Sequence, residues 1–361
     1  MIATSLEIAR ADLARTRWVE QALPEDLPPG GVLLQIESFG LSANNITYGV
    51  LGEAYQYWQH FPATEAAWGR IPVWGFARVL ASAQPQILPG EHVYGFLPMA
   101  THLLVQADQV RSGGFVDASA HRAGLPAAYL GFRRCAADPD YRPELEGLIA
   151  IMRPLALTAF LLDDALAARS GELTRVLMSS ASSKTALLSA RLMRLRPDPR
   201  ARVIGLTAAA RVDEVRKLGA YDEVLAYESL AELEPGVPTA FLDFAGRREL
   251  LHAVHTHLAD GLRLSWQIGL THWQAARGQR EALPGVKPEV FFAPGHYAQR
   301  LKEWGVATLQ SRMAAAWAEV AQWSQAWMEI DTRQGPAAIA AAYLDVLRGQ
   351  GEAGRGLLLR W

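Results

Sequence analysis

The spacing of hydrophobic and polar residues gives the two parts of this chain different rhythms. In the first third, short apolar runs alternate with polar residues and are separated by Gly and Pro, which is typical of half-buried strands. The pattern therefore predicts an all-β segment with loops at this end. The strands expected there are Val32–Phe39, Val73–Leu80, His92–Phe96 and His102–Val105.

From about Leu148 onward, longer helical patterns alternate with short apolar runs, beginning with a helix over Leu148–Ala168. This alternation predicts parallel βαβ units, because two parallel neighbouring strands need a crossover between them. The next expected elements are the strands Arg175–Met178, Arg202–Leu206, Glu223–Leu225 and Ala240–Asp243, and the helices Lys184–Leu195 and Arg211–Leu218.

The last part of the chain continues with helices and ends on a strand. With 361 residues, two domains are the default expectation, and the Pro- and Asp-rich stretch 136–143 is our candidate for a surface excursion between them. The expected elements are a helix that follows Gly246 and runs to about Leu258, a strand in GLRLSWQIGL, helices over Met313–Met328 and Pro336–Leu347, and a closing strand in Gly354–Trp361.

Composition and charge narrow the class of protein. Half of the residues are hydrophobic and a fifth are charged, which favours a folded chain with a large core. Lys and Arg number 35 against 37 Asp and Glu, a formal net charge of −2. Since no global positive field is present, we expect neither a nucleic acid nor an anionic membrane as partner. A small-molecule substrate is the partner that we expect.

The single cysteine, Cys135, excludes an internal disulfide and any zinc site built from two or more cysteines. This usage indicates a reducing cytoplasm. The most apolar stretch is interrupted by Arg153, Pro154, Asp163 and Asp164, and the N-terminus has no apolar stretch long enough for a signal peptide. We therefore expect a soluble protein in the cytoplasm.

The strand Arg175–Met178 leads into a run of small polar residues, SSASSKTA, and then into a helix. In a doubly wound sheet this place binds phosphate, because backbone N–H groups and the positive end of the helix dipole face the anion. The glycines of GxGxxG are absent, and the turn also fits an ordinary helix N-cap. The side chains that would add donors or charge are Ser179, Ser180, Ser182, Ser183, Lys184 and Thr185.

The strands that follow favour NADP over NAD. An NAD site has an acidic residue about 20 residues past the loop, whereas an NADP site has an Arg that neutralises the 2′-phosphate. The second strand ends at Thr207 and is followed by Arg211, with no acid. Tyr227 ends the third strand, where its ring or hydroxyl would flank the adenosine phosphate, and Asp243 ends the fourth at the ligand-binding edge.

Taken together, SSASSKTA, RVIGLTAAARVDEVRKLGAYDEVLAYE, FLDFAG and GRGLLLRW resemble the medium-chain dehydrogenase/reductase superfamily, most closely its zinc-independent quinone oxidoreductase and enoyl reductase branch. SSASSKTA, with RPLALTAFLLDD and FFAP, resembles a branch catalogued as a domain of unknown function. The resemblance implies a fold of the α/β class with two domains. Residues 1–150, completed by 330–361, would form a GroES-like β-barrel catalytic domain, and residues 151–329 a Rossmann NADP-binding domain.

The resemblance also assigns roles to single residues. GLSANNITYG, residues 40–49, lies where the zinc-independent reductases have a GxNxxD segment lining the substrate cleft, and Ser42 and Asn45 replace its Asn and Asp. Asn44, Asn45 and Tyr48 are the candidate catalytic groups. Gly246, Gly269 and Phe292 would border the nicotinamide end of NADPH. Trp58, Trp68 and Trp74 lie near the cleft segment as candidate lining of an apolar pocket. The resemblance further implies a homodimer.

These assignments predict an NADPH-dependent, zinc-independent reductase that transfers hydride to an activated alkene, enone or quinone. The absence of cysteine ligands excludes a zinc alcohol dehydrogenase. The alternative is a Rossmann scaffold that has lost its loop glycines and serves as a non-catalytic binding protein. SSASSKT also ends like a P-loop, but Met178 and Ser183 occupy the glycine positions. The histidines of HAVHTH (His252, His255 and His257) we interpret as helix-surface residues rather than metal ligands.

Overall fold

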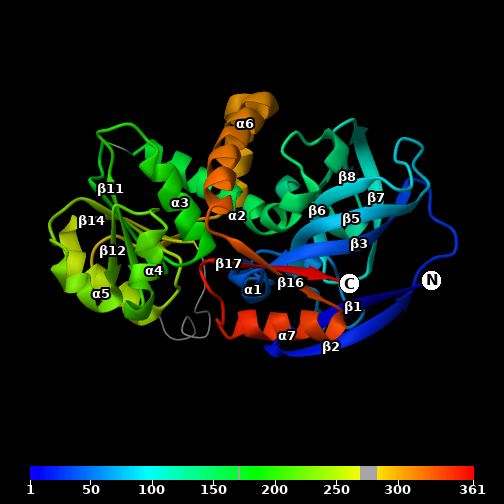
Figure 1. Cartoon of the computed structure of the whole chain (residues 1–361), viewed down its shortest axis with the longest axis horizontal. Coiled ribbons are helices and arrows are strands. Elements are labelled where there is room, and N and C mark those ends of the chain that lie inside the picture. The colour runs from blue at the N-terminus through cyan, green and yellow to red at the C-terminus, as the bar shows by residue number, and fades with distance from the viewer. Residues whose placement is uncertain (170, 269–282) are drawn as a thin grey trace. The chain divides into compact units, whose positions relative to one another are not determined.

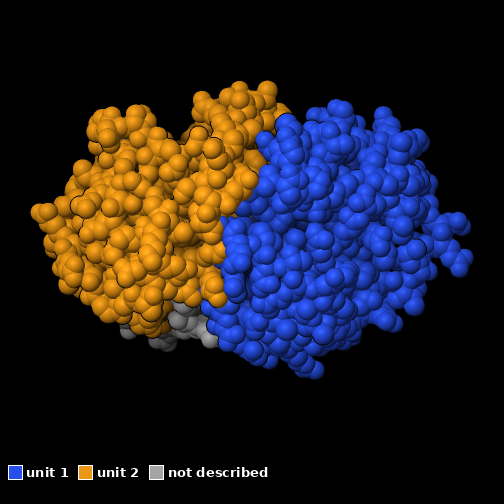
Figure 2. All heavy atoms as spheres, in the orientation of Figure 1, with its two compact units in different colours: residues 1–151, 328–351, 355–361 blue, residues 152–327, 352–354 orange. Residues whose placement is uncertain are grey.

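The computed structural model describes residues 1–169, 171–268 and 283–361, and its contacts divide the chain into two compact units (Figures 1 and 2). Unit 1 comprises residues 1–151, 328–351 and 355–361, and unit 2 comprises residues 152–327 and 352–354. The short segment 352–354, which we expected in the first domain, thus groups with unit 2. The stretch 136–143 lies inside unit 1 rather than between the units, and Asp138 in it is buried.

Unit 1 is built around a closed antiparallel barrel of six strands. Strands pair in the order β3-β5-β6-β9-β8-β7, and an additional pairing of β3 with β7 closes the ring. The barrel strands are β3 (Gly31–Leu41), β5 (Pro72–Ser82), β6 (His92–Pro98), β7 (His102–Arg111), β8 (Gly114–Asp117) and β9 (Gly131–Arg134).

The carboxyl end of the chain adds to the barrel. The last strand, β17 (Arg355–Arg360), pairs antiparallel with β3 and parallel with β16 (Glu329–Gln334). A separate sheet orders its strands β2-β1-β4, from β1 (Ile2–Ala9), β2 (Asp12–Ala22) and β4 (Trp68–Gly69). Helices α1 (Ala43–Val50) and α7 (Pro336–Leu347) complete the unit (Figure 1). The Tyr343 hydroxyl of α7 donates to the Leu13 carbonyl of β2 at 2.9 Å.

Unit 2 contains one six-stranded sheet, parallel throughout, with the order β12-β11-β10-β13-β14-β15. This is the Rossmann arrangement, in which the strand order reverses beside the first strand and creates a ligand site at the carboxyl edge. Its strands are β10 (Arg175–Met178), β11 (Arg202–Thr207), β12 (Glu223–Ala226), β13 (Thr239–Asp243), β14 (Leu262–Gln267) and β15 (Glu289–Val290).

Both faces of this sheet are buried, so its strands are almost continuously apolar. Along β10, Val176 and Met178 face one hydrophobic cluster and Leu177 the other. Leu187 of α3 belongs to the first cluster and Leu251 of α5 to the second. The helices of this part are α3 (Lys184–Arg194), α4 (Val212–Lys217), α5 (Arg248–Leu258), α6 (Ala293–Gln325) and, from Met152 onward, α2 (Glu146–Ala167).

Helices α2 and α6 each differ from a regular amphipathic surface helix. The helical stretch Pro143–Ala167, which includes α2, is long and apolar enough by length and composition to cross a membrane, and 61% of its most apolar 18 residues are buried inside the protein. Packing within the protein thus accounts for much of its apolar character. Helix α6 begins twenty residues before the predicted Met313, and Gly305 interrupts it with φ of 75°.

Candidate functional site

The turn between β10 and α3 is shaped by serine side chains. Ser183 is the N-cap of α3, and its hydroxyl accepts a hydrogen bond from the Ala186 N–H at 3.4 Å. Ser180 adopts φ of 49°, a left-handed conformation that glycine adopts most readily. The chain therefore makes a tight turn at this strand end without any glycine in it.

Ser179 and Asp243 join this turn to the one that follows β13. The Ser179 hydroxyl donates to Asp243 Oδ1 at 2.6 Å and accepts from the N–H groups of Phe244 and Ala245 at 2.9 and 3.0 Å. Asp243 Oδ1 also accepts from the N–H groups of Ala245 and Gly246. Both side chains are almost completely buried. Burial raises the pKa of Asp243, although these hydrogen bonds oppose the increase.

This network gives Ser179, Asp243 and Gly246 a structural role, because they fix two turns of the sheet edge against each other. The sequence assigns all three to cofactor contact. Because the Ser179 hydroxyl and the Gly246 N–H already have protein partners, the structure makes them positioning groups. Direct contact of these residues with a ligand stays a prediction.

A glycine needed for close approach is found in β11 rather than in the turn. A Cβ atom at Gly205 would lie 2.7 Å from the Ala181 Cβ and 3.0 Å from the Tyr221 ring. Ala181 donates its N–H to the Leu206 carbonyl, and the Tyr221 hydroxyl donates to the Ala181 carbonyl, both at 3.0 Å. The turn therefore packs directly on β11. Sequence reasoning missed this because a strand glycine has no fixed spacing from the turn that it accommodates.

Ser182, Lys184 and Thr185 remain at the start of α3 as half-buried polar groups. The hydroxyls of Ser182 and Thr185 make no hydrogen bond within the described part of the chain. The Lys184 ammonium donates to the Glu352 carbonyl at 3.3 Å. Burial and the positive charge of Arg211 lower the pKa of Lys184 to about 8, against an opposing influence of Glu214. Contact of these three side chains with a phosphate stays a prediction.

Thr207 and Arg211 follow the same edge of the sheet on β11. Thr207, the last residue of that strand, is buried, whereas Arg211 is half-buried at the end of a short 3₁₀ turn, Ala209–Arg211. Lys184 follows β10 and Arg211 follows the neighbouring strand β11, and the positive charge of Arg211 contributes to lowering the pKa of Lys184. The structure thus brings together the two positive charges that the sequence proposes for phosphate binding.

Tyr227 reaches across β11 to the turn after β10. Its hydroxyl accepts the Ser180 N–H at 3.1 Å. The Arg247 guanidinium lies over the Tyr227 ring, with 5.7 Å between the Arg247 Cζ and the ring centroid. Burial raises the pKa of Tyr227, and the charges of Arg247 and Arg211 oppose that increase. Sequence reasoning missed Arg247, although it directly follows Gly246 at the end of a ligand-side strand.

Of the three residues predicted at the nicotinamide end, Gly246 is described above, and Phe292 also lies in the described part of the chain. Phe292 directly precedes α6 and is half-buried. Its Cδ1 atom lies 3.3 Å from the place that a Cβ atom on Gly295 would occupy. Phe292 follows β15 and therefore stands at the same carboxyl edge of the parallel sheet as the turns described above. Gly269 lies outside the described residues.

In unit 1, the three candidate catalytic residues all lie on α1. The Asn45 side chain accepts the Ser42 N–H at 2.9 Å and donates to the Pro72 carbonyl at 3.0 Å, so it fixes the start of the helix. Asn44 donates its Nδ2–H to the Tyr48 hydroxyl at 2.8 Å. Tyr48 is buried, and burial raises its pKa. The side chains of Asn44 and Tyr48 are therefore hydrogen-bonded to each other, whereas the side chain of Asn45 is hydrogen-bonded to backbone groups.

Aromatic side chains surround Tyr48. Its ring centroid lies 4.5 Å from that of Tyr57, and the Tyr57 and Tyr129 hydroxyls are 3.1 Å apart. Trp74, one of the three tryptophans named from the sequence, packs 4.9 Å from the Phe96 ring in this cluster. The other two are buried elsewhere: Trp58 lies against Gly52 and Gly69, and Trp68 lies beneath Arg17. Tyr57 and Tyr129 were not found from the sequence, because nothing in their spacing relates them to α1.

The histidines of α5 include one that is not on the surface, contrary to our prediction. His255 is fully buried, with Nε2 2.9 Å from the Ser265 hydroxyl and Nδ1 3.0 Å from the Pro284 carbonyl. Both ring nitrogens are therefore satisfied, which makes it a core histidine. Within residues 1–169, 171–268 and 283–361, no group of three or more His, Cys, Asp or Glu side chains is arranged to hold a metal ion.

The sequence matches a family described as "Protein of unknown function (DUF2855)" over residues 39–352. No curated protein matches it. Solved structures match over nearly the whole chain. CurA of Vibrio vulnificus in complex with NADPH is 15% identical, with a TM-score of 0.62, and the match covers 99% of this chain and 98% of that one.

Two further structures are similar at the same level. A mutant enoyl thioester reductase of Candida tropicalis is 14% identical, with a TM-score of 0.58 and full coverage of both chains. The yhdH oxidoreductase of Salmonella enterica in complex with NADP is 16% identical, with a TM-score of 0.51 and 99% coverage of both chains. These matches confirm the predicted fold class, an α/β chain with a GroES-like β-barrel domain and a Rossmann domain with a doubly wound parallel sheet.

Proposed function

This chain belongs to the DUF2855 family, and from its fold and the groups at its sheet edge we propose that it is an NADPH-dependent, zinc-independent reductase. The substrate would be an activated alkene, an enone or a quinone. The observation that carries the proposal is the pair of neighbouring cations, Lys184 and Arg211, beside the N-terminus of α3 at the carboxyl edge of a Rossmann sheet. Structures of this fold from Vibrio vulnificus and Salmonella enterica hold NADPH and NADP, respectively, which supports it.

The residues at this edge fit a dinucleotide with an additional phosphate. The start of α3 offers backbone N–H groups and the positive end of a helix dipole. Ser182 and Thr185 add hydroxyls that have no protein partner in the described chain, and Lys184 adds charge. Arg211 follows β11, where an NADP site has its basic residue. We propose that SSASSKTA is the phosphate turn of this family, with Ser179 and Gly205 taking over the structural role of its missing glycines.

The chemistry divides between cofactor and protein. When bound, NADPH supplies a hydride and becomes NADP⁺. The acceptor also needs a proton and a hydrogen bond to its carbonyl oxygen. Tyr48, held by Asn44 at 2.8 Å, and Asn44 itself are the groups on α1 that we propose for orienting the acceptor and donating to it. A tyrosine hydroxyl is protonated at neutral pH at its ordinary pKa, and burial raises the pKa of Tyr48 further, so the hydroxyl is a hydrogen-bond donor.

Replacing Arg211 with Glu tests the cofactor assignment. The change should weaken NADPH binding by about 2 kcal/mol or more, because it removes a charge-assisted contact and adds repulsion, while NADH binding stays nearly unchanged. Lys217→Glu makes a similar charge change on an exposed position of α4 and is the matched control. Binding is followed by quenching of tryptophan fluorescence. Equal losses for NADPH and NADH would show that Arg211 does not read the 2′-phosphate.

A second function is favoured by one observation. The N–H groups of Ser180, Ala181 and Ser183 are all bonded within the protein, which leaves the turn fewer donors than a glycine-rich loop offers. A non-catalytic binding protein that kept the fold would have such a turn, with fewer N–H donors available to a phosphate. Consumption of NADPH with a simple quinone or enone, followed at 340 nm, distinguishes the two. Turnover eliminates the non-catalytic binding protein, and its absence despite NADPH binding favours it.

We further propose that the protein acts in the cytoplasm as a homodimer on a small-molecule substrate. The single cysteine, Cys135, is buried and free, which suits a reducing compartment. The edge strand β15 supports the dimer, since it pairs on one side only within the described sheet, and Val290 on it is 54% exposed.

A further inference from the structure

Three cations come from three connections at the carboxyl edge of the unit 2 sheet. Lys184 follows β10, Arg211 follows β11 and Arg247 follows β13. In the sheet, β11 and β13 flank β10 on opposite sides. The connections after β13 and after β12 therefore lie on opposite sides of the turn after β10. A side chain from one of them must extend past this turn to contact a side chain from the other. Arg247 makes this reach, because its guanidinium lies over Tyr227.

Tyr227 is the point on which these charges converge. Its hydroxyl is fixed by the Ser180 N–H, and the positive charges of Arg247 and Arg211 both act on it. Arg211 in turn acts on Lys184. The acidic groups that face this cluster are Asp243, whose Oδ1 is engaged by Ser179 and two N–H groups, and Glu214 on α4. Positive charge therefore predominates around the ring.

Arg247 differs from several other arginines of unit 2. Arg194 and Arg200 are paired with Asp222, and Arg300 with Asp164. Arg247 has no carboxylate partner anywhere in the part of the chain that the structure describes, and its contact there is the face of Tyr227. A guanidinium 5.7 Å above a ring centroid is within cation–π range, and its N–H groups are not used by a carboxylate of the described chain, so they can bind an anion.

We propose that Arg247 is a second specificity-determining cation of the cofactor site, placed by the Tyr227 ring, and that it binds the adenosine 2′-phosphate together with Arg211. The inference rests on the proposed NADPH function and deepens it. A phosphate monoester carries close to two negative charges at neutral pH, so two guanidiniums balance it where one does not. Tyr227 then serves as a positioning residue that holds Arg247 on the β11 side of the site.

The test compares Arg247→Gln with Arg248→Gln, which removes the same charge from the next residue, the first of α5. The ligands are 2′,5′-ADP, NADPH and NADH, titrated calorimetrically. Loss of a charge-assisted contact should weaken 2′,5′-ADP and NADPH about tenfold or more for Arg247→Gln, with NADH changed less than about twofold. Arg248→Gln should change all three less than about twofold, and Arg247→Lys should fall between.

Tyr227→Leu and the double variant Tyr227→Leu/Arg247→Gln test the positioning role. If the ring places the guanidinium, the double variant binds 2′,5′-ADP about as weakly as the weaker single variant, because the second change removes an effect already lost. Matching thermal unfolding of all variants establishes that they are folded. Multiplicative losses overturn the positioning role, and equal losses for NADH and NADPH, or no loss with Arg247→Gln, overturn the specificity role.

Two experimental outcomes distinguish the proposed cofactor binding from the proposed role of Arg247. A wild-type protein that binds neither NADPH nor 2′,5′-ADP below millimolar concentration overturns the proposed function and this inference with it. A wild-type protein that binds both, with Arg247→Gln unchanged, overturns this inference alone.

Discussion

At the scale of single residues, the serine turn shows what a sequence reveals and what it hides. The sequence places the turn at a strand end beside Arg211 and Tyr227, and the structure brings these residues together. It does not reveal which hydroxyls point inward. Ser179 and Ser182 have the same side chain three residues apart, yet Ser179 is fully buried on Asp243 and Ser182 is half-buried at the start of α3. That difference is set by packing against β13, which no local pattern records.

Ser179→Ala should therefore destabilise the protein. The change removes the hydroxyl that accepts from the Phe244 and Ala245 N–H groups and donates to Asp243 Oδ1, while the Ala245 N–H and Asp243 Oδ1 stay hydrogen-bonded to each other, so the free energy of unfolding should fall by about 1–2 kcal/mol. Ser182→Ala, at a hydroxyl with no partner in the described chain, should cost less than about 0.5 kcal/mol. Urea unfolding followed by circular dichroism measures both. Similar costs for the two variants would contradict the buried network.

The depressed pKa of Lys184 predicts that phosphate binding depends on pH. With a pKa of about 8, the ammonium is charged below that pH and loses its proton above it. Affinity for 2′,5′-ADP should fall between pH 7 and pH 10, by roughly tenfold for the loss of one charged contact. Bound phosphate favours the charged ammonium, so the pKa of Lys184 is higher in the complex than in the free protein. The affinity therefore falls mainly over the pH range between these two pKa values. Lys184→Arg stays charged throughout, and its affinity should be nearly independent of pH over this range.

At the scale of elements, the periodic segments were predictable and the irregular ones were not. The predicted bounds of β10 and of α7 match the structure residue for residue, because an apolar run and an amphipathic helix each have a clear period. The hairpin of β1 and β2 was not recognised. Glu7 interrupts the apolar pattern of β1, yet it is fully buried between Arg17 and Arg70. A buried ion pair formed by distant residues gives no signal in a local pattern.

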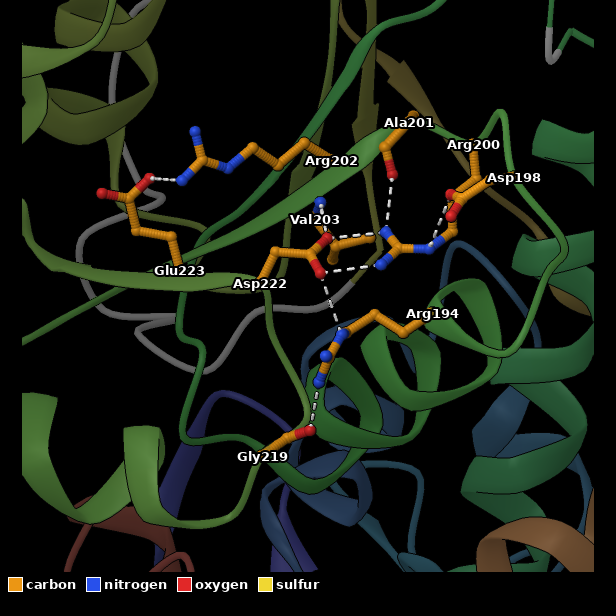
Figure 3. A network of polar contacts seen from close by, with 9 residues as sticks. All are labelled: Arg194, Asp198, Arg200, Ala201, Arg202, Val203, Gly219, Asp222 and Glu223. Atoms are coloured by element: carbon orange, nitrogen blue, oxygen red, sulfur yellow. Dashed lines mark hydrogen bonds and ion pairs between the residues drawn. The ribbon is translucent and has the colours of Figure 1, made fainter.

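The opposite edge of the unit 2 sheet is held by a charged network that the sequence also does not indicate (Figure 3). Asp222 precedes β12 and accepts from the N–H of Val203 at 2.8 Å, from Arg200 at 2.7 and 2.8 Å, and from Arg194 at 3.0 Å. The hydrogen bond with Arg200 is the largest cause that lowers the pKa of Asp222 to about 2. The carboxylate thus ties the end of α3 and the start of β11 to β12.

Asp222→Asn should lower the free energy of unfolding by about 2 kcal/mol at pH 7. A lowered folded-state pKa means that the contribution is complete above the unfolded pKa near 4 and is lost as the pH falls to about 2. Wild type should therefore lose more stability than the variant between pH 4 and pH 2. Parallel stability curves for the two proteins over this range would contradict the assignment.

At the scale of the whole molecule, the order of elements was enough to predict one β-rich part and one part with a parallel sheet. The alternation of strands and helices after Leu148 indicates the parallel sheet, and the first third indicates an all-β segment, whereas the barrel was expected only from the resemblance. The closing pairing of β3 with β7 and the return of β17 to β3 join segments far apart in the chain, so sequence patterns did not reveal them. They were expected only in outline, through resemblance to the medium-chain reductases.

The proposed homodimer makes a prediction at this scale. If the β15 edge forms the interface, Val290→Lys should shift the sedimentation mass from about twice the 39.5 kDa of the chain to that of a monomer, because it places a charge on an exposed edge position. Val306→Lys, at an equally exposed valine on α6, is the control and should leave the dimer intact. A dimer that survives Val290→Lys would place the interface elsewhere.

The central claim is that the edge of the unit 2 sheet binds NADPH. The most direct test is titration of the wild-type protein with NADPH and with NADH, followed by quenching of its eleven tryptophans. With Lys184, Arg211 and Arg247 at the site, we predict saturable binding of NADPH in the micromolar range and binding of NADH at least about tenfold weaker, the loss expected for one charged phosphate contact. Failure of both nucleotides to bind below millimolar concentration would contradict the account.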